Sequence, residues 1–342
     1  MRRDQDDYAL RLGVEALSDM CIQLGIAIPV GKDSLSMRTS WSENQEDFEV
    51  KSPLSGVITA MAPVSNVSMA ITTELDRQGS SDFYHLTLSN QTRMGGSIFE
   101  EVTSSFLHET PDIEDVQIFK NLFNSIQEMI NRGWVTSLHD VSDGGLFTTL
   151  AEFAFTNKVG IKILLSNELE GNTSIYQDIF SEETGAAIQF HSDFEGQALE
   201  YLQQNNIAHR KCATQTLEPH ITIVKNNDIK FQQSVIALEK IWSETSLAIK
   251  SNRDNPASAQ QEYDLIECFN KEGLVAEDSF QFSSQLPVIH SDIKPKIAIF
   301  REQGVNGQNE MAAAFMLAGF EAQDVHMQDI LDNPDLLSSF QG

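Results

Sequence analysis

The sequence predicts a mixed fold of the α/β and α+β classes, and the order of its apolar segments carries the prediction. Between residues 83 and 249, short apolar runs alternate with stretches that have helical spacing. A second strand–helix–strand pattern begins at Lys296, with strands expected at 297–300 and 321–326 and a helix at 309–317. The 342 residues are enough for two or three domains.

The first 68 residues are predicted to form a unit of their own. Apolar residues recur three or four apart over residues 8–24, which indicates an amphipathic helix. Apolar runs at 26–30 and 54–67 are expected to be strands, the second one central in its sheet. The polar, acidic stretch 41–51 between them is expected to be an exposed hairpin or loop.

Residues 69–250 carry the main alternation of strands and helices. Helices are expected at 116–130, 176–180, 194–204 and 231–249, and strands at 83–88, 134–138, 159–165, 186–190 and 221–224. Residues 251–294 are polar and aperiodic, which predicts a linker or a wrapped loop. Only the first strands of a further domain fit between residues 295 and 342, so we expect the chain to be a piece of a longer protein.

Charge and composition argue against several classes of partner. With 50 acidic and 23 basic residues the net charge is −27, which disfavours binding to nucleic acid or to an anionic membrane. Cys21, Cys212 and Cys268 are scattered and form no C-x-x-C pair, which favours reduced thiols. The sequence has no apolar leader and no run of about 18 apolar residues, so we expect a soluble, cytoplasmic protein.

The stretch from Ser137 to Leu146 places two carboxylates, a hydroxyl and two glycines directly after an apolar strand. A helix follows, and Ser142 or Asp143 is expected to cap it. Free N–H groups at such a helix start bind anions, and Asp140 and Asp143 would hold a hard cation such as magnesium beside a bound phosphate. A capped loop without a ligand is the alternative, because one short motif is weak support.

Two further loops combine the end of a predicted strand with glycine. In residues 31–37, Lys32 offers a positive charge and Ser34 a hydrogen-bond donor, but the spacing is not that of a P-loop. Residues 90–97 form the other loop. Each loop is also compatible with a plain turn.

Five short stretches stand out when the chain is taken as a whole. They are residues 29–37 (PVGKDSLSM), 138–146 (LHDVSDGGL), 253–256 (RDNP), 296–306 (KIAIFREQGVN) and 309–315 (NEMAAAF). In this order they resemble the large single-chain form of phosphoribosylformylglycinamidine synthase, the FGAR amidotransferase family. Each stretch alone is weak, but the set is specific and runs along nearly the whole chain.

The resemblance implies both a fold and an activity. Members of this family use ATP and glutamine to convert formylglycinamide ribonucleotide into the amidine in purine biosynthesis. ATP activates the formamide oxygen, and ammonia from a class I glutaminase domain displaces it. The chain would contain the end of a ferredoxin-like domain (1–68), an α/β domain like that of aminoimidazole ribonucleotide synthetase (69–250), a linker (251–294) and the start of the glutaminase domain (295–342).

The resemblance also implies site residues. Asp140 would bind magnesium, Ser142 would contact the nucleotide, and the loop that begins at Gly31 would line the nucleotide and substrate cleft. Residues 301–306 resemble the loop at the edge of the glutaminase pocket. With the turn residues above, the expected metal ligands are Asp140 and Asp143, and the expected nucleotide- or substrate-binding residues are Gly31, Lys32, Ser34, Ser142 and Gly144. The expected cofactors are Mg²⁺ and ATP or ADP.

By itself the chain is expected to be inactive. No cysteine stands at a glycine-flanked strand-to-helix elbow, so the glutaminase triad is expected beyond Gly342. The expected partners are the other synthetase half, the rest of the glutaminase domain, and the substrates formylglycinamide ribonucleotide, ATP and glutamine. Two alternatives stay open. One is a complete ATP-dependent enzyme of the same superfamily, such as aminoimidazole ribonucleotide synthetase or thiamine-phosphate kinase, and the other is a non-catalytic subunit that binds Mg–ADP.

Overall fold

A computed structural model describes residues 6–32, 38–77, 81–88, 91–107, 109–165, 173–268, 276–277, 279 and 293–342. The chain divides into two units, Met1–Lys271 and Glu272–Gly342. Within the described residues, no helix is both long enough and apolar enough to span a membrane.

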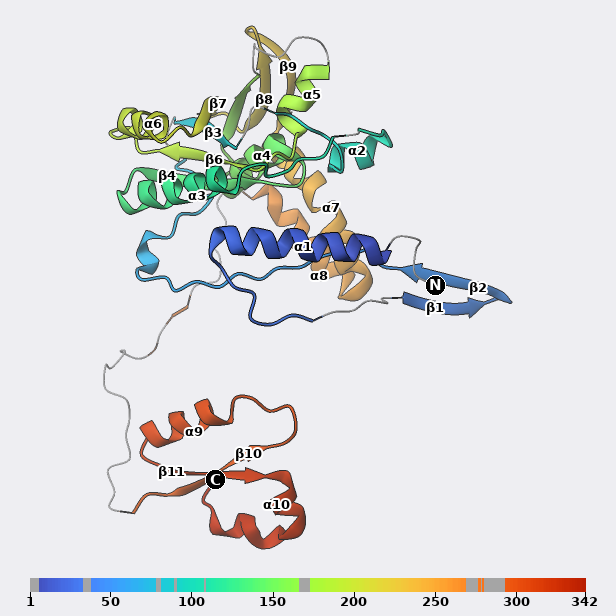
Figure 1. Ribbon diagram of the computed structural model, residues 1–342, viewed down its shortest axis with the longest axis vertical. Coiled ribbons are helices and arrows are strands. Elements are labelled where there is room, and N and C mark those ends of the chain that lie inside the picture. Colours follow the sequence, from blue (N-terminus) through green and yellow to red (C-terminus); the bar gives the residue numbers. More distant parts are fainter. Residues whose placement is uncertain are drawn as a thin grey trace. The chain divides into compact units, whose positions relative to one another are not determined.

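The first unit is built around a sheet that has seven strands in the described part of the chain (Figure 1). The strands are β3 (Asp82–Thr87), β4 (Val135–Val141), β5 (Gly160–Leu164), β6 (Gly185–Phe190), β7 (Ala208–Thr216), β8 (His220–Lys225) and β9 (Asp228–Ser234). Their order is β4-β6-β3-β7-β5-β8-β9, and neighbours are antiparallel except β5 and β8. This mixed sheet confirms the predicted α/β and α+β classes.

Helices cover both faces of this sheet. The helices of this part are α2 (Ile98–Thr103), α3 (Val116–Asn131), α4 (Gly145–Asn157), α5 (Thr173–Phe180), α6 (Glu195–Gln204), α7 (Val235–Arg253) and α8 (Pro256–Asp264), and those that pack on the sheet are α3 to α7. Phe83 and Tyr84 are neighbours on β3 and point to opposite faces. Phe83 belongs to a buried cluster with side chains of α4, α5 and α7, and Tyr84 to a second cluster with side chains of α3 and α6. The sheet therefore lies between two helical layers.

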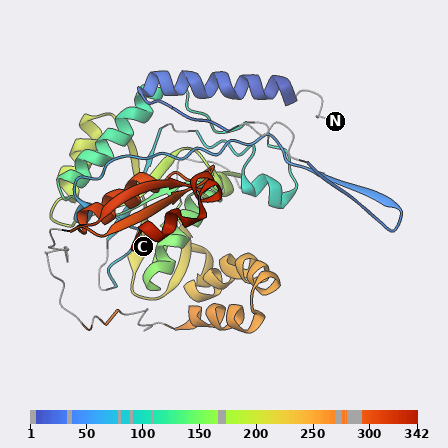
Figure 2. The same ribbon diagram turned by 90° about the horizontal axis from the view of Figure 1, so that it is seen from below.

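Two strands predicted in the N-terminal part of the chain do not form. The helix α1 (Asp6–Leu24) and the hairpin of β1 (Arg38–Glu43) and β2 (Glu46–Lys51) are present as predicted (Figure 2). Residues 26–30 are irregular, and so are residues 54–67 up to a short 3-10 turn, so both strand predictions are wrong. A strand needs a neighbour for its hydrogen bonds, and no described residue pairs with either run. Apolar side chains in the second run stay in solvent as a result.

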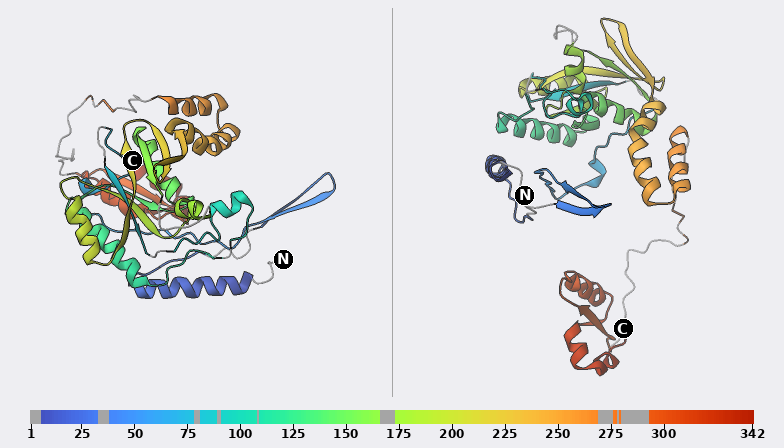
Figure 3. Two further views of the ribbon diagram at one scale, coloured as in Figure 1. Left: turned by 90° about the horizontal axis from the view of Figure 1, so that it is seen from above. Right: turned by 90° about the vertical axis from the view of Figure 1, so that its right-hand side faces the viewer.

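The residues around 230 and 255 also differ from the prediction. The predicted helix at 231–249 begins only at Val235, because β9 first pairs with β8, and the strand β7 was not predicted. The stretch predicted as a linker starts in helical structure. Asn255 caps α8 through its side chain, and α7 and α8 lie side by side (Figure 3). The hydroxyl of Tyr263 donates a hydrogen bond to the carbonyl of Lys240 at 3.2 Å and ties the two helices together.

The second unit contains the predicted strand–helix–strand. The strands β10 (Lys296–Arg301) and β11 (Glu321–His326) are parallel and joined by α9 (Gln308–Leu317). The helix α10 (Met327–Asp332) and a 3-10 segment (Pro334–Ser339) follow. The guanidinium of Arg301 donates from Nε to both carboxylate oxygens of Asp324, at 2.9 and 2.8 Å, across the two strands.

His85 on β3 predicts a pH dependence of stability. Its Nε2 atom is buried without a hydrogen-bond partner among the described residues, and burial, with a smaller contribution from Arg210, lowers its pKa to about 3. In the unfolded chain its pKa is about 6.5, so between these values acid protonates only the unfolded state. The free energy of unfolding should therefore fall as pH drops below about 6.5, by about 1.4 kcal/mol per pH unit from this group.

The variant His85→Leu isolates this contribution. Urea unfolding at pH 7 and pH 5 should show that the wild type loses about 2 kcal/mol more than the variant over this interval. The exposed His191 provides the control, because His191→Leu should follow the wild type. Equal losses in the wild type and in His85→Leu would contradict the buried, neutral state of His85.

Candidate functional site

The turn between β4 and α4 holds the central motif of the sequence. β4 continues to Val141, three residues beyond its predicted end, so His139 and Asp140 belong to the strand. Ser142 and Asp143 follow in the turn and are exposed, and the side chain of Asp140 is 73% exposed. The two carboxylates and the hydroxyl are thus accessible to a ligand.

Two glycines with left-handed backbone begin α4. Gly144 is the N-cap residue with φ +80°, and Gly145 follows with φ +66°. The expected side-chain cap from Ser142 or Asp143 is wrong, because glycine occupies the cap position. The N–H of Gly144 donates instead to Oε1 of Glu182 at 2.8 Å. A carboxylate of the protein thus accepts the hydrogen bond of an N–H group that was expected to donate to a bound anion.

The carboxylate of Glu182 also reaches a second loop. The same Oε1 atom accepts from the N–H of Ile98 at 3.0 Å, and Ile98 is the first residue of α2. Glu183 holds the same loop through Arg93, whose Nε and Nη2 donate to its two carboxylate oxygens at 2.6 and 2.8 Å. The two side chains are 11% and 7% exposed, and the hydrogen bond to Glu183 raises the pKa of Arg93 further. Consecutive glutamates therefore fix two glycine-containing loops.

His139 lies between two carboxylates beside this turn. Its Nδ1 is 3.0 Å from Oδ1 of Asp140, and its Nε2 is 2.7 Å from Oε2 of Glu152 on α4. The other oxygen of Glu152 accepts from the indole N–H of Trp242 on α7 at 3.0 Å. A chain of polar contacts thus runs from α7 to the exposed carboxylate of Asp140.

The residues of the turn can form an open magnesium site but not a closed one. No group of three or more His, Cys, Asp or Glu side chains suited to a metal occurs among the residues that the structure describes. Magnesium commonly uses one or two carboxylates together with waters and substrate phosphates. Asp140 and Asp143 offer this kind of oxygen ligand at the surface of the turn. The donor set therefore fits Mg²⁺ that arrives with a nucleotide.

The second predicted loop is only partly described. Gly31 and Lys32 lie in an irregular, exposed stretch that follows α1. Ser34 lies outside the described residues. The contribution of these three residues to one site with Ser142 and Gly144 stays a prediction.

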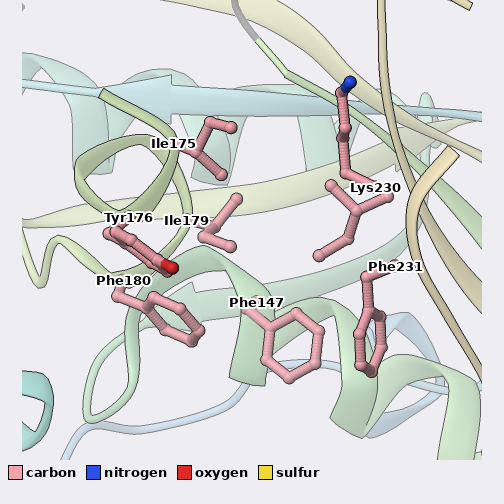
Figure 4. Close-up of a pocket in the computed structure, with 8 residues that line it drawn as sticks. Phe147, Ile175, Tyr176, Ile179, Phe180, Lys230 and Phe231 are labelled. Atoms are coloured by element: carbon pink, nitrogen blue, oxygen red, sulfur yellow. The ribbon is translucent and has the colours of Figure 1, made fainter. Parts of the chain in front are cut away.

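A pocket with aromatic walls lies close to Gly145 and was not predicted. Its volume is about 420 Å³, and Figure 4 shows its lining side chains, Phe147, Ile175, Tyr176, Ile179, Phe180, Lys230 and Phe231, with Ile223 as a further member. Phe147 is in the first turn of α4, and the backbone of Phe180 packs against Gly145. These residues come from separate elements, α4, α5, β8 and β9, so no local sequence pattern marks the pocket.

The cysteines have no pairing in the structure. Cys21, Cys212 and Cys268 are all free, and they are half-buried, buried and exposed, respectively. Burial raises the pKa of the Cys212 thiol to about 12. At neutral pH this thiol is protonated, so Cys212 is no nucleophile.

Three family models match the chain in order. They are the FGAR-AT PurM_N-like domain over residues 1–63, the C-terminal domain of AIR synthase related proteins over 85–213, and the CobB/CobQ-like glutamine amidotransferase domain over 294–342. In this order the chain is similar to an FGAR-AT-type domain, to the C-terminal domain of AIR synthase related proteins and to a glutamine amidotransferase domain. These matches confirm the resemblance to the FGAR amidotransferase family that the five motifs carried.

Several solved structures match part of the chain. Phosphoribosylformylglycinamidine synthase II from Thermotoga maritima shares 14% identity, with 81% of this chain and 39% of that chain covered and a TM-score of 0.45. T. maritima PurL complexed with FGAR shares 14% identity, with 79% of this chain and 39% of that chain covered and a TM-score of 0.46. A thiamine-monophosphate kinase from Stenotrophomonas maltophilia K279a shares 12% identity, with 45% of this chain and 53% of that chain covered and a TM-score of 0.33. The chain spans about two fifths of the length of the two T. maritima proteins.

Proposed function

We propose that the chain is part of an ATP- and glutamine-dependent ligase that converts formylglycinamide ribonucleotide into formylglycinamidine ribonucleotide in de novo purine biosynthesis. The order of the three family matches carries this proposal. A synthetase domain and a glutamine amidotransferase domain in one chain supply the two activities that the reaction needs. One activates an amide oxygen with ATP, and the other releases ammonia from glutamine.

The chain acts together with partners in this proposal. They are the other synthetase half and the rest of the glutaminase domain, and without them the isolated chain is inactive. The small-molecule substrates are formylglycinamide ribonucleotide, ATP and glutamine. The location is cytoplasmic, which is supported by the three unpaired thiols.

The turn after β4 is the proposed contact for the magnesium nucleotide. Asp140 and Asp143 hold Mg²⁺ through carboxylate oxygens, and the hydroxyl of Ser142 contacts the nucleotide. A magnesium ion, when bound, neutralises phosphate charge and orients the phosphates. Gly144 gives the turn its backbone shape, since its φ of +80° suits glycine. His139, the preceding residue on β4, contacts the carboxylate of Asp140 and restricts its rotamers.

The loop after α1 is the proposed contact for the substrate cleft. Lys32 supplies a positive charge for a phosphate group, and Gly31 allows the backbone to approach it closely. Ser34 donates its hydroxyl to the nucleotide or the substrate. These assignments rest on the match of this stretch to the family motif and on the residue types.

A chimeric enzyme tests the proposed function. The 342 residues replace the corresponding part of a complete FGAR amidotransferase, and the gene is expressed in a purine-requiring bacterium that lacks this enzyme. We expect growth without added purine. A chimera that is present as folded, soluble protein and yet supports no growth would contradict the proposal.

The variant Asp140→Asn of the same chimera tests the metal ligand. Calorimetry should show at least a tenfold weaker affinity for Mg–ADP, about 1.4 kcal/mol, because an amide oxygen carries no charge for Mg²⁺. Asp193→Asn, an exposed carboxylate near α6, is the matched control and should bind as the wild type does. Equal affinities for Mg–ADP in the wild-type chimera and in both variants would show that Asp140 is not a metal ligand.

A further inference from the structure

The short segment between α5 and β6 connects two glycine-containing loops of the first unit, the one before α2 and the one before α4. Oε1 of Glu182 accepts hydrogen bonds from the N–H groups of Gly144 and Ile98, at 2.8 and 3.0 Å. Both N–H groups stand at helix starts, where no carbonyl of the same helix can accept from them. One carboxylate oxygen therefore satisfies two amides from segments that are 46 residues apart.

The residue before Glu182, Ser181, contacts both loops. A Cβ atom on Gly145 would lie 2.7 Å from the carbonyl oxygen of Ser181, so only glycine allows this approach. The hydroxyl of Ser181 donates to the carbonyl of Arg93 at 2.9 Å. Glu182 thus belongs to a rigid connection, in which it supplies the contact to the N-cap residue of α4.

The negative charge of Glu182 also stabilises its contacts with the two helix starts. A carboxylate at a helix start interacts favourably with the positive end of the helix dipole, and charge-assisted hydrogen bonds are stronger than neutral ones. Because Gly144 donates to Glu182, its N–H is committed to the protein and does not donate to a phosphate. The ligand is then held by Asp140 on β4 and by Ser142 and Asp143, and the directions of the last two side chains depend on the backbone of the turn.

We propose that Glu182 is a positioning residue for the nucleotide site. It fixes the turn 142–145 through the N–H of Gly144, and so it holds the side chains of Ser142 and Asp143 in the orientation that binds the magnesium nucleotide. This proposal rests on the proposed function of the turn. It assigns a role to a residue that lies 39 positions after Asp143 and contacts the site only through the backbone.

Two substitutions in the full chain, Glu182→Gln and Glu182→Ala, test this role. They separate the effect of the acceptor oxygen from the effect of the negative charge. Glutamine keeps an acceptor oxygen for both amides, whereas alanine removes it. Amide hydrogen exchange measured by NMR should be at least tenfold faster for Gly144 and Ile98 in Glu182→Ala, and close to wild type in Glu182→Gln. Glu200→Ala, at an exposed position of α6, is the control and should leave both rates unchanged.

Nucleotide affinity provides the second measurement. In calorimetry with Mg–ADP, Glu182→Ala should bind at least tenfold more weakly, and Glu182→Gln within about threefold of wild type. Tighter binding by Glu182→Ala would overturn the proposal, because Glu182 would then compete with phosphate for the amide. Unchanged binding by Glu182→Ala, with its two amides exposed, would overturn it as well.

The two measurements also separate this proposal from the proposed function. If the wild-type chain binds no Mg–ADP, the nucleotide site itself has failed. The exchange rates of Gly144 and Ile98 then still decide whether Glu182 fixes the turn. Unchanged exchange in Glu182→Ala, with a normal circular dichroism spectrum, would overturn the positioning role by itself.

Discussion

Gly145→Ala is expected to lower the free energy of unfolding of the first unit by about 3–4 kcal/mol. The added Cβ would lie 2.7 Å from backbone atoms of Phe180 and Ser181, closer than real Cβ atoms approach other atoms. These backbone atoms belong to the last residue of α5 and to the residue after it, and they cannot rotate away. The φ of +66° adds strain, because left-handed backbone is unfavourable for every residue with a side chain. Urea unfolding monitored by circular dichroism measures the loss.

Two other glycines serve as matched controls for this variant. Gly133 has φ +71° and no atom within 4 Å of an added Cβ, so Gly133→Ala should cost only the backbone strain, about 1 kcal/mol. In Gly144→Ala the new Cβ would meet the side chain of Thr148, which can change rotamer. Its cost should lie between the other two. Equal losses in the free energy of unfolding for Gly133→Ala and Gly145→Ala would contradict the close contact between Gly145 and the backbone at the end of α5.

Arg93→Met is expected to destabilise the first unit by about 3–5 kcal/mol, because it leaves the carboxylate of Glu183 buried without its counter-charge. Both side chains are nearly inaccessible, and the guanidinium makes two parallel hydrogen bonds to the carboxylate. Its Nη1 also donates to Glu114 at 2.6 Å. The loss is measured by urea unfolding at neutral pH. Arg11→Met removes an exposed pair with Glu15 and should cost less than about 1 kcal/mol.

A double-mutant cycle separates the ion pair from the packing. In Glu183→Gln the amide oxygen still accepts from the backbone N–H of Arg93, which donates to Oε1 at 3.1 Å in the wild type. The double variant Arg93→Met/Glu183→Gln removes both charges, and we expect it to be more stable than Arg93→Met alone. Additive losses would mean that the two side chains are not coupled in solution.

Local periodicity predicted the helices well, and missing neighbours explain the wrong strands. α1 and α3 have apolar residues at helical spacing, and such a pattern depends on the helix alone. The run 54–67 has the composition of a central strand, but strand formation depends on a partner elsewhere in the chain. β7 is polar along much of its length and forms because β3 and β5 lie on either side of it. Ser234, whose hydroxyl accepts from the N–H of Ala237, was a readable start signal for α7 that the prediction did not use.

The candidate site was predictable where its residues are adjacent in sequence. Asp140, Ser142 and Asp143 stand together, and their residue types and spacing are enough to suggest a metal and a nucleotide. Glu182 was not predictable as the acceptor for Gly144, because an acceptor for a backbone amide needs no particular spacing or partner residue type. The left-handed angles of the two glycines explain why the cap falls at Gly144 rather than at a serine or an aspartate.

The position of β3 in the sheet has a consequence for synthesis on the ribosome. β3 is the first of these strands to be made, and it pairs with β6 and β7, which follow roughly a hundred residues later. The centre of the sheet therefore cannot assemble before Thr216 has left the ribosomal tunnel. Until β6 is made, Phe83 and Leu86, which are fully buried in the finished structure, lie on a strand that has no partner strand beside it. Long-range pairing of this kind slows folding and leaves nascent apolar segments open to chaperones or to aggregation.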